Sequence, residues 1–125
     1  MTTDTARRMT LGYVNVFVSN FDACCTFFTE VLGLPQNQRE DSFGYASFNA
    51  GHISFGIART DDTTLVGRHT GVGFVVADIE ATYQDLVAKG VEFEMPPTKQ
   101  PWGGTLALMK DPDGNIYYLD PGGPH

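Results

Sequence analysis

The chain has 125 residues, of which 42% are hydrophobic and 18% charged, which suits one folded domain and excludes a disordered one. Its formal net charge of −7 disfavours a nucleic-acid partner, because a phosphate backbone would repel it. No apolar run reaches the roughly 18–20 residues of a membrane span. Residues 1–9 lack the apolar core of a signal peptide, so we expect a cytoplasmic protein that does not bind membranes.

The first predicted elements are a strand over residues 11–18 and a helix over residues 21–32. Three valines alternate with other residues in the strand, as in a sheet with one buried face. Asn20 is suited to cap the helix, and Gly33 and Pro35 end it. This half of the chain therefore begins as a strand followed by an amphipathic helix.

Two further strands are predicted over residues 43–49 and 52–58, joined by a tight turn at residues 49–51. The polar stretch 36–42 is expected to add a short strand. Residues 59–70 show no periodicity and are interpreted as the connection to the second half of the chain.

The second half repeats this order. A strand begins at Gly71, and Asp78 caps a helix over residues 79–89. A short strand is expected over residues 91–94. The last two strands, 105–109 and 116–119, flank the turn Asp111-Pro112-Asp113-Gly114-Asn115, in which Pro fixes φ and Gly accepts a positive φ.

The order strand, helix, strand, strand, strand thus occurs twice, and a duplicated half predicts two similar units with a ligand groove between them. We predict an α+β fold of two βαβββ modules that form a cup-shaped mixed sheet with helices on its outer face. The whole chain, 1–125, is expected to be a single domain, with module one at about 10–58 and module two at about 70–120.

Three groups of short motifs carry a resemblance to a known family. They are Val18-Ser19-Asn20-Phe21-Asp22 with Leu32-Gly33-Leu34-Pro35, Val76-Ala77-Asp78-Ile79 with Lys89-Gly90-Val91, and Pro101-Trp102-Gly103-Gly104 with Asp111-Pro112-Asp113-Gly114-Asn115. In this order they resemble the glyoxalase / bleomycin-resistance / extradiol dioxygenase group, the vicinal oxygen chelate superfamily, over roughly residues 10–120. The resemblance implies paired modules that form a cup. For a chain with one pair of modules it also implies a homodimer with its cups at the subunit contact.

Metal-using members of this group place His, Gln or Glu at inward strand positions. In this chain the residues at those inward positions are Tyr13, Gly71 and Tyr118. Glycine has no donor atom and neutral Tyr is a poor ligand, whereas a divalent metal needs several converging N or O donors. We therefore predict a member without the metal site and without another cofactor.

The three histidines and two cysteines of the chain do not suggest a metal site elsewhere. His69 is placed at the edge of the connecting loop and His125 on the tail, while His52 is placed at the start of a strand, facing inward or as an exposed strand end. Cys24 and Cys25 are adjacent and have no other cysteine to pair with. Both are interpreted as small apolar residues of the helix.

Strand alternation and the resemblance together nominate the residues that line the cup. Aromatic walls bind flat or cationic rings, each contact contributing roughly 0.5–2 kcal/mol. A carboxylate would suit a basic ligand group. Core packing or a dimer contact is the alternative role for each aromatic residue. The candidate ligand-binding residues are Tyr13, Asn15, Phe17, His52, Gly73, Trp102, Tyr118 and Asp120.

These residues favour a metal-independent protein that binds and sequesters a small molecule, like the bleomycin-resistance branch, with an aromatic ligand that is neutral or cationic. The alternative is a glyoxalase-like or epimerase-like lyase or isomerase that acts on a small carbonyl compound. That chemistry normally relies on a metal to stabilise an enediolate, so the sequence leaves enzymatic activity open. A third possibility is an interaction subunit with a vestigial cup.

Overall fold

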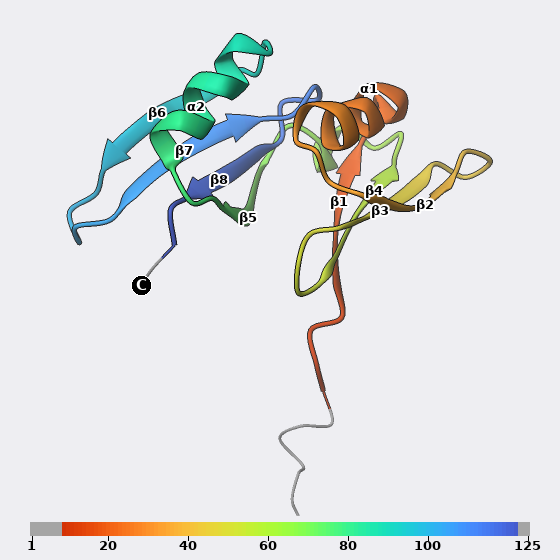
Figure 1. The fold of residues 1–125 in the computed structure, drawn as a ribbon. Coiled ribbons are helices and arrows are strands. Elements are labelled where there is room, and N and C mark those ends of the chain that lie inside the picture. The colour runs from red at the N-terminus through yellow and green to blue at the C-terminus, as the bar shows by residue number, and fades with distance from the viewer. Residues whose placement is uncertain (1–8, 123–125) are drawn as a thin grey trace, which may run out of the picture.

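The computed structural model of the protein describes residues 9–122, and Figure 1 shows their fold. The strands form two four-stranded sheets with the orders β1-β4-β3-β2 and β5-β8-β7-β6. The expectations for residues 1–8 and for His125 lie outside the described residues. The elements are β1 (Tyr13–Val18), α1 (Phe21–Thr26), the π-helical turn η2 (Phe27–Val31), β2 (Gln36–Glu40), β3 (Tyr45–Asn49), β4 (Ser54–Arg59), the short 3-10 helix η3 (Thr63–Leu65), β5 (His69–Val75), α2 (Ile79–Ala88), β6 (Phe93–Lys99), β7 (Thr105–Lys110) and β8 (Ile116–Asp120).

Each sheet is one βαβββ module. The first strand of each module pairs in parallel with the last, β1 with β4 and β5 with β8, and the remaining neighbours are antiparallel. The predicted repeat, the α+β class and the mixed sheets are therefore confirmed. Within the described part of the chain, no helix is long and apolar enough to cross a membrane.

The first helix changes its hydrogen-bonding pattern halfway along. Asn20 caps α1 by accepting a hydrogen bond from the Ala23 backbone N–H (3.3 Å). From Phe27 the helix continues as η2, in which the Leu32 N–H reaches back five residues to the Phe27 carbonyl (2.9 Å). A π turn holds more residues than an α turn. The consecutive residues Phe27 and Phe28 are both buried.

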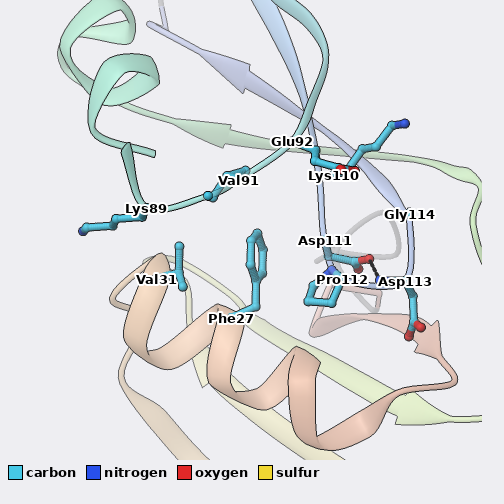
Figure 2. Close-up of a pocket in the computed structure, with 11 residues that line it drawn as sticks. Phe27, Val31, Lys89, Val91, Glu92, Lys110, Asp111, Pro112, Asp113 and Gly114 are labelled. Carbon is cyan, nitrogen blue, oxygen red and sulfur yellow. Dashed lines mark hydrogen bonds between the residues drawn. The ribbon is translucent and has the colours of Figure 1, made fainter. Parts of the chain in front are cut away.

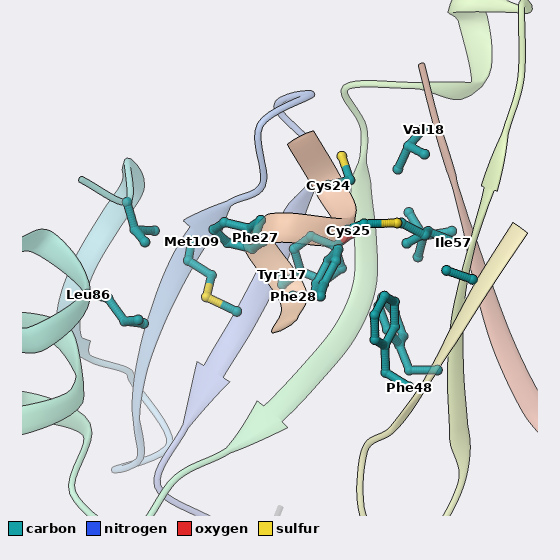
Figure 3. Close-up of a cluster of buried hydrophobic side chains, with 14 of the residues drawn as sticks. Val18, Cys24, Cys25, Phe27, Phe28, Phe48, Ile57, Leu86, Met109 and Tyr117 are labelled. Carbon is teal, nitrogen blue, oxygen red and sulfur yellow. The ribbon is translucent and has the colours of Figure 1, made fainter. Parts of the chain in front are cut away.

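A cluster of aromatic rings joins the two modules into one core (Figure 3). The Phe28 ring lies 5.0 Å from Phe55 and 5.6 Å from Phe48 in the first sheet, and 5.8 Å from Tyr117 in the second. Fully burying one such side chain contributes roughly 1.5–3 kcal/mol. The helix α2 adds one buried residue, Leu86, over the second sheet.

Two strands differ from the sequence prediction. The strand β6 extends to Lys99 instead of ending at residue 94, even though Pro96 and Pro97 cannot donate ladder hydrogen bonds. It is an edge strand with two register shifts against β7, which is where a sheet tolerates proline. The strand β4 begins at Ser54, so His52 lies exposed in the preceding turn and does not begin the strand.

The turn 111–115 fastens the second module to the first. The carboxylate of Asp113 accepts hydrogen bonds from the Ser19 backbone N–H (2.7 Å), the Ser19 hydroxyl (2.8 Å) and the Asn20 N–H (3.0 Å). The Asn115 side chain donates to the Phe17 carbonyl (3.1 Å) and accepts from the Gly67 N–H (2.7 Å). We call these contacts of Asp113 and Asn115 the module latch.

The buried carboxylate of Asp111 holds the turn that carries the module latch. Asp111 accepts hydrogen bonds from the Tyr117 hydroxyl (2.8 Å), the Asn115 side chain (3.0 Å) and the backbone N–H groups of Asp113 (2.9 Å) and Asn115 (3.0 Å). Burial raises the pKa of Asp111, and the hydrogen bonds from Tyr117 and Asn115 offset part of that rise. The turn is therefore held rigid from inside the second module.

The pKa of Asp113 moves in the opposite direction. Burial raises it, but the hydrogen bonds from the Asn20 backbone and from Ser19 together lower it by more, so the net pKa lies below the ordinary value. A lowered pKa in the folded state means that the ionised form stabilises the fold. That contribution is complete above the pKa of the unfolded chain, about 4, and is lost as the pH falls through the folded value.

We expect Asp113→Ala to lower the free energy of unfolding by about 1–3 kcal/mol, because Ser19 and Asn20 lose a charged acceptor. Urea denaturation at pH 7 measures this, with Asp61→Ala in the exposed connecting loop as the control. The difference between Asp113→Ala and the wild type should shrink as the pH is lowered below about 4. Equal losses in both variants would show that the latch does not stabilise the fold.

Candidate functional site

Each sheet has one face covered by helices and one open face. In β1, Val16 and Val18 are buried, whereas Tyr13 and Phe17 on the opposite side are 64% and 43% exposed. Asn15 shares this open side with them because strand side chains alternate. The structure therefore places all three candidate residues of β1 on the open face of the first sheet.

A polar pair that the sequence analysis missed lies on the same face. The Tyr45 hydroxyl on β3 approaches Asn15 Oδ1 (3.4 Å) across β4. Gly56 lies between them, and a Cβ there would collide with Asn15 Oδ1 and meet the Tyr45 hydroxyl at 2.8 Å. Glycine thus leaves the space in which the two side chains meet. The signal that could have found Tyr45 is the alternation of side chains along the predicted strand 43–49, which places Tyr45 on this face.

On the second sheet, His69 and Tyr118 lie together. Their ring centroids are 4.8 Å apart. Gly73 pairs with Tyr118 and His69 with Ile116, so four residues of β5 span the distance that two residues span on β8. Gly71 has a φ of +76°, which glycine adopts freely, within this irregular stretch.

This bulge changes the register expected for the strand that was predicted to begin at Gly71. His69, at the edge of the loop as predicted, is already the first residue of β5 and has the register that a regular strand would give to Gly71. Its Nδ1 accepts a hydrogen bond from the Gly71 N–H (3.1 Å). The other ring nitrogen, Nε2, is therefore the one available to a ligand.

The remaining candidates are more dispersed. Trp102 lies in the turn between β6 and β7 and is 59% exposed. Asp120, at the end of β8, accepts a hydrogen bond from the Gly122 N–H (2.8 Å). Among residues 9–122, no ring contact within one chain joins Tyr13, Trp102 and Tyr118. One chain thus brings together His69, Gly73 and Tyr118, but not the candidate aromatic residues Tyr13 and Trp102.

The side chains present do not fit a metal centre within one chain. In the described part of the sequence, no three His, Cys, Asp or Glu residues gather closely enough to hold a metal ion. The thiol of Cys24 is buried and donates to Asp113 Oδ2 (3.4 Å). Burial, with the nearby charges of Asp111 and Asp113, raises the pKa of Cys24, so it remains a protonated thiol and a poor nucleophile.

A cleft of about 560 Å³ lies away from these candidates, between the first helix and the second module. Figure 2 shows Phe27 and Val31 on one side, facing Lys89, Val91 and the turn that contains Asp113. Its charged groups have mixed signs, and Lys89 and Lys110 are paired with Asp85 and Glu94. The arrangement gives no sign of one preferred ligand charge.

Paired βαβββ modules with helices on one face and an exposed second face define a class of small α+β proteins with an accessible sheet surface. The chain belongs to the Glyoxalase/Bleomycin resistance protein/Dioxygenase superfamily, whose family model matches residues 10–117. The resemblance inferred from the motifs is therefore confirmed.

Known proteins similar to this chain include both binding proteins and enzymes. The uncharacterized protein YraH of Bacillus subtilis is 29% identical over 121 residues, which cover 86% of this chain and 94% of YraH. TnmS3, an antibiotic binding protein from Streptomyces sp. CB03234, superposes with a TM-score of 0.76 at 23% identity, covering 90% of this chain and 96% of TnmS3. Lactoylglutathione lyase from Agrobacterium tumefaciens has a TM-score of 0.76 at 16% identity, covering 91% and 94% of the two chains. These structural likenesses show the shared fold, and a fold alone does not decide between binding and catalysis.

Proposed function

We propose that this protein is a metal-independent small-molecule-binding protein that sequesters a flat aromatic ligand, neutral or cationic, between the open sheet faces of a homodimer. The observation that carries the proposal is the set of large apolar side chains exposed on or beside the open faces of a single chain. They are Tyr13, Phe17, Val75 and Trp102.

An exposed apolar surface of this kind favours association. Val75, in the edge strand β5, is 71% exposed. Exposed apolar patches commonly mark binding or docking surfaces, and these residues come from β1, β5 and the turn between β6 and β7. A second copy would cover the open faces and place Tyr13 or Trp102 of one chain opposite Tyr118 of the other.

The second sheet has room for a planar ligand beside Tyr118. A Cβ added at Gly73 would meet only the Tyr118 Cβ, at 3.5 Å. The strand backbone beside the Tyr118 ring is therefore open, and a flat ring can stack there. Asp120 on the same face supplies a carboxylate, which suits a cationic ligand, as does the net charge of −7.

The antibiotic binding protein TnmS3 shares this fold, so the fold is compatible with a binding role. A specific observation also favours the second candidate function, a lyase or isomerase. His69 Nε2 and the Tyr118 hydroxyl lie on neighbouring strands, and both are groups that can transfer protons. Turnover of a glutathione hemithioacetal that is lost in Tyr118→Phe would place this enzyme reading ahead of the binding one.

We expect Trp102→Ala to weaken the binding of proflavine, a flat aromatic cation, about tenfold, because one aromatic or cation–π contact contributes roughly 0.5–2 kcal/mol. Calorimetric titration measures the affinity. Trp102 is the single tryptophan of the chain, so quenching of its fluorescence in the wild type reports a ligand at this position.

Phe43→Ala is the matched control, because Phe43 is another exposed aromatic residue, in the turn between β2 and β3. It should leave the affinity for proflavine unchanged. Equal affinity in the wild type and Trp102→Ala would place the ligand elsewhere and contradict the proposed site.

We expect the wild-type protein to be a dimer in solution and Val75→Glu to raise its dissociation constant at least tenfold, because the change places a charge in the apolar contact. Sedimentation equilibrium measures this. Val87→Glu, on the exposed side of α2, serves as the control and should remain dimeric. A monomeric wild type would remove the basis for the shared binding site.

A further inference from the structure

A second, smaller cavity lies where the two modules meet. Its volume is about 280 Å³, and it lies between β1 and the segment that leads into β5. We call it the seam cavity. It is lined by Val14, Asn15, Val16, Phe17, Leu65, Arg68, His69, Thr70, Val72 and Asn115.

The charge of the seam cavity is opposite to that of the whole protein. The chain carries a net charge of −7, yet the lining of this cavity contains an arginine and a histidine and no carboxylate. The three other cavities described for residues 9–122 each contain at least one Asp or Glu. A positive lining inside an acidic protein favours an anionic ligand group.

Arg68 is the one arginine of this lining, and it is exposed. Arg68 makes its hydrogen bonds to the fold through its backbone, which donates to Asn115 Oδ1 (3.3 Å) and accepts from the Ile116 N–H (2.9 Å). No ion pair joins its side chain to another residue in the described part of the chain. By contrast, Arg39 is held by Asp22 and Asp41.

Further donors border the same space. The Nδ1 of His69 is occupied by the Gly71 N–H, which leaves Nε2 as the second ring nitrogen. The Asn15 amide interacts with Tyr45 through Oδ1, and its NH₂ group makes no hydrogen bond to the described residues. Both β1 and β5 are edge strands of their sheets, and residues of both line the cavity.

The rest of the lining is apolar. Val14, Val16, Val72 and Leu65 supply hydrocarbon walls. A bare inorganic ion would not use these walls, whereas a small organic acid would bury its hydrocarbon part against them. The planar fork of arginine matches the geometry of a carboxylate.

We propose that the seam cavity binds a small organic carboxylate, with the carboxylate on Arg68 and the apolar body against the valines of β1 and β5. This inference goes beyond the proposed function. The seam cavity shares Asn15, Phe17 and His69 with the candidate site, but the proposed ligand has the opposite charge, and its test does not depend on Trp102 or on the affinity for proflavine.

The test is titration of the full chain with benzoate and with benzamide, its neutral analogue of the same shape, followed by calorimetry and by amide chemical shifts. We expect benzoate to bind at least tenfold more tightly than benzamide, with the largest shifts at Leu65 and Thr70. Arg68→Gln should weaken benzoate binding about ten- to hundredfold, the range that a charge-assisted hydrogen bond supplies. Arg68→Lys, which keeps the charge, should retain part of the affinity.

Arg59→Gln is the control, because Arg59 lies over the Phe21 ring at 5.9 Å, outside the seam cavity. The backbone contacts of Arg68 survive its replacement, so the variant should fold, and its thermal midpoint verifies this. Equal binding of benzoate and benzamide, unchanged affinity in Arg68→Gln, or shifts confined to other residues would overturn the proposal. Inorganic phosphate that binds as tightly as benzoate would overturn the role of the apolar walls. Loss of proflavine binding in Trp102→Ala bears on the proposed function alone.

Discussion

The carboxylate of Asp113 is the contact on which the arrangement of the two modules depends. It belongs to the last turn of the second module, and it accepts hydrogen bonds from Ser19 and Asn20 at the start of the first helix. This fixes the end of β1 beside the start of β5 and β8. The N-cap of α1 and the seam cavity both lie at that junction.

Two glycines shape the open faces in different ways. Gly56 leaves room for Asn15 and Tyr45 to meet across β4. Gly71 adopts a positive φ within the bulge that brings His69 beside Tyr118. In one sheet the missing Cβ provides space, and in the other glycine's backbone freedom shifts the register. The polar groups of both open faces therefore depend on residues that contribute no functional group themselves.

Local patterns in the sequence were sufficient to predict the repeat, the helix caps at Asn20 and Asp78, and the turn 111–115, because each depends on neighbouring residues. The candidate site was harder to predict from the sequence. The resemblance assigned Gly71 to an inward strand position, where the structure has His69, because a bulge cannot be recognised from the sequence pattern alone. Arg68 was missed for another reason: its significance comes from β1, which lies about fifty residues away in sequence and beside it in space.

The shared ring cluster under α1 has a consequence for how the duplicated halves behave. Phe28 comes from the first half of the chain, but its ring packs against Tyr117 of the second as well as against Phe55 of its own. The helix of the second half, α2, buries only Leu86, whereas the first helix buries Phe21, Cys24, Cys25, Phe27 and Phe28. Neither half therefore encloses a complete core, and the two must unfold together as one cooperative unit. The two halves are equivalent in topology, but they are not independent in folding stability.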